Sequence, residues 1–324
     1  MSTEIGGRSC TATITVPATS ANLGPGFDCL GLALDLRNEF VVTRDGPDLP
    51  VAGHKTRYTV QVAGVDADKV PANRRNLMIS AVEAVFAAVG RRPAAVALSI
   101  TNCIPVGSGL GSSSSAIIAG LAAGNALVDG GLSPSEILAM AVTMEGHPDN
   151  VAPAMLGGLV LGVLPDADYG PAELIVRRMT PPPWKVVIVL PDFYLPTSKA
   201  RAVLPSGLSR GESIFNTSRF GLLLEALTSG DTTYLRTAMA DRLHQPHRLA
   251  IIPGARDAYQ AAYEAGAAGV ALSGAGPSLL AFATGNGQSE ARAMTRAFAA
   301  AGMNSRTWLL EPSATGITIA IETA

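Results

Sequence analysis

The stretch PVGSGLGSSSS at residues 105–115 constrains the fold more than any other part of the chain. It follows a strand predicted over residues 96–100, places Gly107, Gly109 and Gly111 at alternate positions, and opens a very apolar helix. Glycines let the backbone turn tightly and expose successive N–H groups, and a helix N-terminus adds about half a positive charge. The alternative interpretation is a strand-to-helix turn in which the serines only cap the helix. Three glycines followed by four hydroxyls favour a loop that binds phosphate.

This loop differs from the two common nucleotide motifs. No Lys-Ser or Lys-Thr pair follows it, as a Walker A loop requires, and its G-x-G-x-G spacing is not the Rossmann fingerprint. The chain has four lysines against twenty arginines, and none of the lysines follows a glycine-rich run. We therefore expect Mg²⁺ to supply the cationic charge that phosphoryl transfer needs, with Ser112 and Glu145 as its protein ligands.

The composition excludes several classes of protein. Hydrophobic residues make up 48% of the 324 residues and charged residues only 15%, so the chain is globular rather than disordered. The formal charge is −2 and no run of five like charges occurs, which argues against nucleic-acid binding. The longest apolar stretches, of about 14 residues, are shorter than the ~18 that a membrane span needs. Three cysteines without a C-x-x-C pair and an N-terminus without a signal-like segment predict a cytoplasmic protein with no membrane partner.

The hydrophobic pattern around the loop alternates between helical and strand periods, which predicts an α+β or α/β fold. Capping signals predict a helix over residues 76–89 and another that starts at Ser133. A strand over residues 11–16 is expected to end at Pro17, with a loop over residues 18–28.

Three consecutive prolines within residues 179–184 predict a domain boundary, which places residues 1–180 in one domain and residues 181–324 in a second. The helices expected in the second half cover residues 213–228, 231–242, 256–265 and 289–301. Its strands are expected over residues 186–190, 270–272 and 279–283.

A second group of polar residues lies in the segment EGHPDN that begins at Glu145. Glu145 is predicted at the C-terminal end of a helix, where its charge opposes the helix dipole. An exposed glutamate at a helix end is the alternative interpretation. However, Glu145, His147, Asp149 and Asn150 place four functional groups within six residues, between two apolar segments. This density indicates a site.

Weaker candidates lie elsewhere in the chain. Asn22 and Asp28, in a glycine-rich segment, either recognise an amine or hydroxyl or merely stabilise turns. Arg201 and Arg248, in proline-broken segments, carry the planar fork that matches a carboxylate, although such arginines are more often solvated surface charges.

Three segments, in this order, resemble the signature motifs of the GHMP small-molecule kinases: PATSANLGPGFD at residues 17–28, PVGSGLGSSSS at 105–115 and SGAGPS at 273–278. The segments EGHPDN and HQPHR are similar to those of the branch that phosphorylates homoserine. The resemblance covers nearly the whole chain. It implies an N-terminal ribosomal-protein-like α/β domain, a C-terminal ferredoxin-like domain and an active site between them.

The resemblance also implies an activity. This is the ATP-dependent phosphorylation of the side-chain hydroxyl of L-homoserine to O-phospho-L-homoserine, a step of threonine biosynthesis, with Mg²⁺ present. Two alternatives stay open: a kinase of the same family that acts on another small alcohol, and a non-catalytic ligand sensor with the same fold. A homodimer is the family expectation, and feedback inhibition by threonine is not decided by the sequence.

The resemblance assigns roles to individual positions. The residues expected to wrap the ATP phosphates are Pro105, Val106, Gly107, Ser108, Gly109, Leu110, Gly111, Ser112, Ser113, Ser114 and Ser115. The expected catalytic residues are Ser112 and Glu145, which would reach Mg²⁺, and Thr197, which would lie near the reacting hydroxyl. The expected substrate-binding residues are Asn22, Asp28 and His147 at the amine or hydroxyl end, Arg201 and Arg248 at the carboxylate, and Gly274.

The catalytic base is left open at this stage. Asp149 or Asn150 lies where a base is expected, and the third option, which we favour, is proton loss to a phosphate oxygen or water. Asn73 and Asn76 are candidates for contacts to adenine by loose analogy alone.

Overall fold

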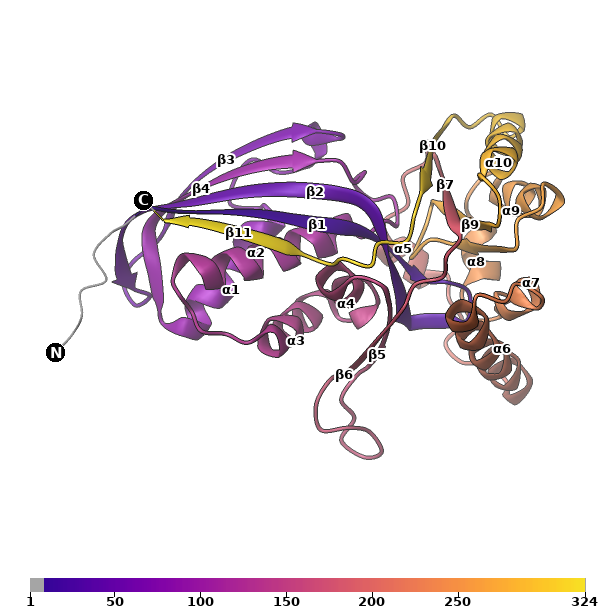
Figure 1. Ribbon diagram of the computed structural model, residues 1–324, viewed down its shortest axis with the longest axis horizontal. Coiled ribbons are helices and arrows are strands. Elements are labelled where there is room, and N and C mark those ends of the chain that lie inside the picture. Colours follow the sequence, from indigo (N-terminus) through magenta and orange to yellow (C-terminus); the bar gives the residue numbers. More distant parts are fainter. Residues whose placement is uncertain (1–8, 324) are drawn as a thin grey trace.

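The computed structural model describes residues 9–323, which form two β-sheets with helices packed against them (Figure 1). The first eight residues, where the sequence predicts no secretory signal, and residue 324 lie outside the described part. The mixture of helices and sheets confirms the expected α+β class.

The first sheet contains β1 (Cys10–Asn22), β2 (Gly26–Pro50), β3 (Arg57–Gly64), β4 (Arg91–Asn102), β5 (Leu159–Val163), β6 (Ile175–Met179) and β11 (Thr318–Thr323). Its main strand order is β11-β1-β2-β4-β3, and β5 adds to β2 and carries β6. The short helix η1 (Ala67–Lys69) and the helices α1 (Leu77–Val89), α2 (Ser112–Leu127), α3 (Pro134–Glu145) and α4 (Pro148–Leu156) belong to this half. Figure 1 shows α1–α4 on one face of the sheet.

Alternation along the strands explains why the helices cover one face. Ala12, Ile14 and Val16 of β1 are buried, whereas the threonines between them are only half-buried. In β2, Phe40 and Val42 continue the buried row. Because successive side chains point to opposite faces of a sheet, these residues form one apolar surface for α1–α4.

The second sheet contains β7 (Lys185–Pro191), β8 (Gly269–Leu272), β9 (Leu279–Ala283) and β10 (Ser305–Leu310), in the order β10-β7-β9-β8. Its helices are α5 (Thr197–Ala202), α6 (Arg210–Ser229), α7 (Leu235–Ala238), α8 (Gln245–Leu249), α9 (Ala255–Glu264) and α10 (Gln288–Ala300). The succession β7–α9–β8–β9–α10–β10 is the split βαβ arrangement of a ferredoxin-like domain, with α5–α8 inserted after β7.

Local signals placed several helices correctly. Asn76 caps α1 by accepting a hydrogen bond from the N–H of Met78, and Gly90 ends the helix in the left-handed conformation. Ser133 and Glu136 form the expected capping box of α3.

Two expectations were wrong. The first strand continues through Pro17 to Asn22, and most of the expected loop over residues 18–28 belongs to β1 and β2. Pro17 is tolerated because β11 pairs with β1 only as far as Thr15, so the missing N–H of Pro17 has no partner strand on that side.

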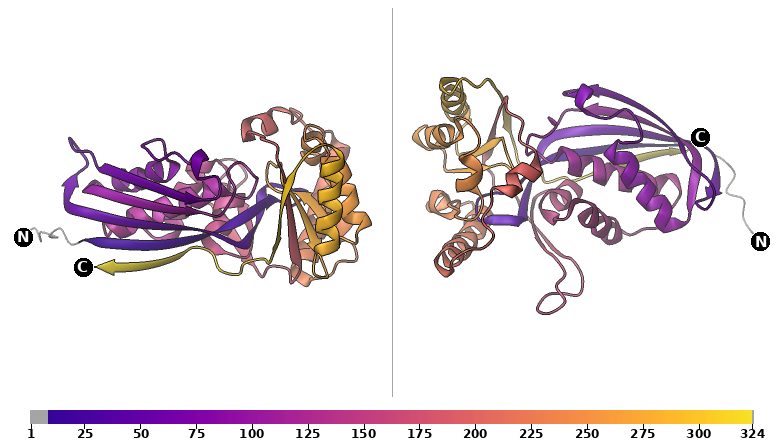
Figure 2. Two further views of the ribbon diagram at one scale, coloured as in Figure 1. Left: turned by 90° about the horizontal axis from the view of Figure 1, so that it is seen from above. Right: turned by 180° about the vertical axis from the view of Figure 1, so that it is seen from behind.

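The helix expected over residues 231–242 shrinks to the four residues of α7. Asp231 and Asp241 accept hydrogen bonds from backbone N–H groups two to four residues further on, which competes with helix formation. The last strand, β11, returns from the second half of the chain to the first sheet, where it pairs with β1 (Figure 2). No helix within residues 9–323 is long and apolar enough to cross a bilayer.

Candidate active site

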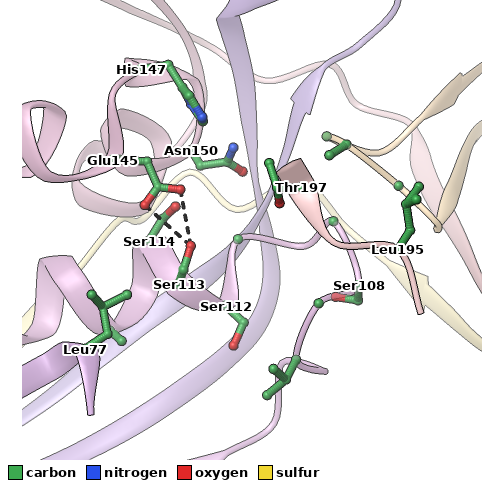
Figure 3. Close-up of a pocket in the computed structure, with 18 of the residues that line it drawn as sticks. Leu77, Ser108, Ser112, Ser113, Ser114, Glu145, His147, Asn150, Leu195 and Thr197 are labelled. Carbon is green, nitrogen blue, oxygen red and sulfur yellow. Dashed lines mark hydrogen bonds between the residues drawn. The ribbon is translucent and has the colours of Figure 1, made fainter. Parts of the chain in front are cut away.

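A cavity of about 320 Å³ lies where the two domains meet and collects most of the expected residues (Figure 3). The expected residues that line it are Asn22, Asp28, Val106, Gly107, Ser108, Gly109, Gly111, Ser112, Ser113, Ser114, Glu145, His147, Thr197, Arg201, Arg248 and Gly274. Pro105, Leu110 and Ser115 do not line it. All three are buried, so the structure places them beneath the loop rather than on its surface.

The loop over residues 105–111 presents its backbone to this cavity. Gly107, Gly109 and Gly111 all have positive φ angles, and α2 begins directly after Gly111. Within residues 9–323, the N–H groups of residues 107, 108, 109 and 111 form no hydrogen bond. The first-turn N–H groups of α2 also lack partners within their helix. The loop and helix together offer a set of free N–H donors suited to phosphate oxygens.

Close packing holds the loop against two other glycine-rich segments. A Cβ on Gly109 would overlap the carbonyl oxygen of Ser273 and lie 2.9 Å from that of Gly276. The Ser273 hydroxyl donates a hydrogen bond of 2.8 Å to the Gly109 carbonyl. A Cβ on Gly111 would overlap Thr19. The three motifs, far apart in sequence, therefore meet at this loop.

Glu145 lies at the C-terminal end of α3 and faces the start of α2. Its carboxylate accepts hydrogen bonds from the Ser113 hydroxyl, at 3.2 Å to Oε1 and 3.4 Å to Oε2. Figure 3 shows Ser113 turned toward Glu145, whereas Ser112 points away from it. Neighbouring helical residues point in directions about 100° apart, which the sequence alone could not resolve here. A carboxylate beside hydroxyls is an all-oxygen donor set, so these residues fit Mg²⁺.

An anionic group also lines the cavity. Asp28, His147 and Asp149 each bring one polar atom to within 4.8 Å of the others. His147 Nδ1 contacts the Asp149 carboxylate, and Asp149 is 2% exposed. Burial alone would lower the pKa of His147, but the hydrogen bond and charge of Asp149, with the charges of Asp28 and Glu145, outweigh it and raise that pKa. The charges of Asp28, Asp149 and Glu145 therefore favour positive charge at this place.

Two arginines face this anionic group. Arg201 donates two hydrogen bonds to Asp28, of 3.0 and 2.9 Å, which raise the pKa of the guanidinium. Arg248 is 2% exposed and donates from Nε to the carbonyl of Ala200 at 3.1 Å. Burial, followed by the charge of Arg201, lowers the pKa of Arg248 to about 10. A guanidinium with that pKa is still charged at neutral pH.

The whole chain is similar to known proteins of one kind. Two family models match it, described as the N-terminal domain of GHMP kinases at residues 76–158 and the GHMP kinase C-terminal domain at residues 223–302. The homoserine kinase of Moorella thermoacetica is 42% identical over 292 residues, which cover 90% of this chain and 93% of the relative. The homoserine kinase of Gloeobacter violaceus is 46% identical over 268 residues, 83% of this chain and 86% of the relative.

The chain belongs to the homoserine kinases of the GHMP kinase family.

Solved structures agree with this assignment. The crystal structure of homoserine kinase from Cytophaga hutchinsonii superposes with a TM-score of 0.82 at 28% identity, covering 96% of this chain and 97% of that one. A mevalonate kinase from L. major shares the fold at 18% identity, with a TM-score of 0.62, a coverage of 96% of this chain and 99% of that one. The two-domain GHMP kinase fold expected from the motifs is confirmed.

Asn22 lines the cavity and also joins two of the motifs. Its side-chain nitrogen donates to the carbonyl of Gly274 at 2.9 Å, and its oxygen accepts from the N–H of Asp28 at 2.9 Å. Both ends of the amide are therefore used to tie the first motif to the third. Gly274 likewise contributes its carbonyl to Asn22 and to Arg248 Nη1.

The two candidates for a catalytic base are also held by neighbours. Asp149 is contacted by His147 and accepts a hydrogen bond of 3.3 Å from Asn150. Asn150 accepts from the Thr19 hydroxyl at 2.8 Å. An amide is not a base, so of these two only Asp149 has the required chemistry.

The possible adenine contacts differ from each other. Asn76 lines the cavity but uses its oxygen to cap α1 and its nitrogen to bind the carbonyl of Pro71. The Asn73 oxygen accepts from the N–H of Arg75. Asn73 does not line the cavity, and both ends of the Asn76 amide already have a partner.

Sequence reasoning missed the ring of Phe27. The guanidinium carbons of Arg201 and Arg248 lie 5.7 and 5.3 Å from its centroid, so the ring contacts both arginines and the two cation–π contacts help to orient them. Its position next to Asp28 is the only signal in the sequence, and only the fold brings the arginines to it.

Proposed function

We propose that this protein transfers the γ-phosphoryl group of ATP to the side-chain hydroxyl of L-homoserine and yields O-phospho-L-homoserine. One observation carries the proposal: a single cavity holds free backbone donors at one end and the Asp28, Arg201 and Arg248 charges at the other. A nucleotide phosphate and a zwitterionic amino acid fit these two ends. Two relatives that are named homoserine kinases match this chain over 93% and 86% of their lengths, which supports the choice of substrate.

At the nucleotide end, the free N–H groups of residues 107–109 and 111 bind the phosphate oxygens of ATP. They act together with the N-terminus of α2, whose dipole favours negative charge. No side-chain cation belongs to residues 105–115, so the backbone provides the donors there.

Mg²⁺ belongs to the same end. Glu145 and the hydroxyls of Ser112 and Ser113 are the residues that would hold it, because they are the oxygen donors beside the loop. When bound, the ion neutralises negative charge on the phosphate oxygens. Glu145, by accepting the Ser113 hydrogen bond, orients that hydroxyl toward the carboxylate.

At the substrate end, Asp28 and Arg201 present opposite charges side by side. An α-amino acid carries an ammonium and a carboxylate on one carbon, so it complements such a pair. We assign the ammonium to Asp28 and the His147–Asp149 group, and the carboxylate to Arg201 and Arg248. Mevalonate lacks the amine that this arrangement would bind.

The hydroxyl to be phosphorylated lies near Thr197, which begins α5 and points into the cavity in Figure 3. Asp149 and Asp28 are both engaged by neighbouring donors, so we assign no side-chain base. The proton passes to a phosphate oxygen or water, and rate enhancement comes from positioning and from electrostatics.

The test is ADP release from ATP in the presence of Mg²⁺, with homoserine, serine, threonine, mevalonate and shikimate offered separately. Turnover with homoserine alone is expected. Turnover with another alcohol would keep the nucleotide end and overturn the amine and carboxylate assignments. Binding of ATP and homoserine without turnover would support a ligand sensor instead.

We also propose a cytoplasmic homodimer. The three cysteines, Cys10, Cys29 and Cys103, are all free, which suits a reducing compartment. Light scattering of the purified protein gives the molar mass, and a value near 33.2 kDa rather than twice that mass would contradict the dimer.

A further inference from the structure

Asn38 of β2 is a polar residue in an otherwise apolar row. Phe40 and Val42, two and four residues further on, face the helices and are buried in the core. Asn38 lies on the same face and is 2% exposed. A buried amide without partners would be costly, so its hydrogen bonds explain why it is there.

The Asn38 side chain contacts both ends of the phosphate loop. Its oxygen accepts hydrogen bonds from the N–H groups of Cys103 and Ile104, at 2.7 and 2.9 Å, just before the loop. Its nitrogen donates to the hydroxyl of Ser115 at 3.0 Å, just after the loop. The Ser115 hydroxyl in turn donates to the carbonyl of Ser112 at 2.9 Å, in the first turn of α2. One side chain therefore sets the spacing between the two ends of the loop.

The N–H groups of the loop fall into two sets. The first set donates to side chains. The N–H groups of Cys103 and Ile104 donate to Asn38, and that of Val106 donates to Asp66 at 3.1 Å. Those at residues 107–109 and 111 bind no other group within the part of the chain that is described. Because side chains hold the first set of N–H groups, the loop keeps its shape while the second set stays free to bind a ligand.

We propose that Asn38 is a positioning residue for phosphoryl transfer, which holds both ends of the phosphate loop so that its free N–H groups converge on the nucleotide. This inference rests on the proposed function, since it assumes that the loop binds ATP. Asn38 does not line the cavity and acts only through the backbone of Cys103 and Ile104 and through Ser115.

The test compares Asn38→Ala with a matched asparagine. Asn125 also holds backbone groups, the N–H and carbonyl of Leu132, but at the far end of α2. A displacement of about 1 Å at a reacting group costs roughly 100-fold. We expect Asn38→Ala to lower kcat/KM for ATP by about 100-fold and to leave the KM for homoserine within about twofold. Asn125→Ala should leave both KM values within about twofold at a comparable loss of stability.

A conservative variant separates positioning from structure. Asn38→Asp keeps the oxygen that accepts from Cys103 and Ile104 and replaces only the nitrogen that donates to Ser115. It should regain at least about tenfold in kcat/KM for ATP over Asn38→Ala. If Asn38→Asp is as impaired as Asn38→Ala, or if Asn38→Ala raises the KM of both substrates equally, the proposal is overturned.

Two further measurements keep the test decisive. If Asn38→Ala does not fold, Ser115→Ala breaks the link at one end only and should lower kcat/KM for ATP by about tenfold; unchanged kinetics would overturn the proposal. Calorimetric titration with ATP alone reports loop geometry without turnover. If the wild type binds ATP but does not phosphorylate homoserine, the proposed function fails. Weakened ATP binding in Asn38→Ala would then still support the positioning role of Asn38.

Discussion

The nucleotide end and the substrate end of the proposed site use different chemical groups. At the nucleotide end, one continuous segment, residues 105–115, supplies backbone N–H groups and hydroxyls and contains no charged residue. At the substrate end, charged side chains from separate segments pair with one another, as Asp28 does with Arg201, and a local pair of His147 with Asp149 lies beside them. In the proposed function, local backbone geometry recognises the phosphate, whereas the amino acid is recognised by charges, most of which only the fold brings together.

This difference predicts different sensitivities to substitution. The nucleotide end should fail when backbone shape is changed, and the substrate end should fail when charge is changed. Each prediction below changes one property at one end and measures both substrates.

The largest effect is expected from Gly109→Ala. The new Cβ would overlap the Ser273 carbonyl, and the φ angle of +81° is strained for any residue with a side chain. We expect kcat/KM for ATP to fall more than about 100-fold.

Gly90→Ala is the control for this change. Gly90 has a similar φ of +78° but nothing within 4 Å of an added Cβ, so it should cost about 1 kcal/mol of stability without altering kinetics. Similar behaviour of the two variants would mean that contact with the third motif is irrelevant.

The next largest effect is expected from Arg248→Ala. Removing a buried guanidinium from the carboxylate site should weaken homoserine by about 2 kcal/mol or more, roughly 30-fold in KM, and leave the KM for ATP nearly unchanged. Arg44→Ala removes another buried arginine, which binds the carbonyl of Leu127 far from the cavity, and serves as the control. Equal losses for both substrates in Arg248→Ala would falsify the carboxylate assignment.

A smaller effect is expected from Asp28→Asn. Asp28 has a φ of +57°, and asparagine tolerates this left-handed conformation, so the variant removes charge while keeping backbone shape. We expect the KM for homoserine to rise about tenfold and the KM for ATP to stay constant. A rise in the KM for ATP instead would place Asp28 at the nucleotide end.

The smallest effect concerns Cys29, which reports the field at the substrate end. Burial, with the charges of Asp149 and Asp28, raises the pKa of this thiol to about 12. The thiolate is the reactive form, so alkylation at pH 8 should be very slow. Asp28→Asn removes one of the charges that raise the pKa, so the alkylation rate measured by mass spectrometry should increase ~3-fold. An unchanged rate would show that burial alone controls the thiol.

Secondary structure was predictable where the signal is local. The helices α1 and α3 carry their own caps, Asn76 and the pair Ser133 and Glu136. Prediction failed where a distant partner decides. Whether Pro17 ends a strand depends on how far β11 extends along β1, and β11 lies about three hundred residues away.

The sequence of residues 105–115 by itself determined a loop at positive φ that leads into a helix, because glycine spacing and capping act between neighbours. The motif resemblance named the segments that meet this loop and the charged residues near it. Only the tertiary structure decided that Asn22 donates to the carbonyl of Gly274 and that Ser113 rather than Ser112 donates to Glu145. It also decided that Asn38 hydrogen-bonds to both ends of the loop. The reason is that a side chain has few hydrogen bonds to make, and which partners receive them depends on distances that the folded chain alone fixes.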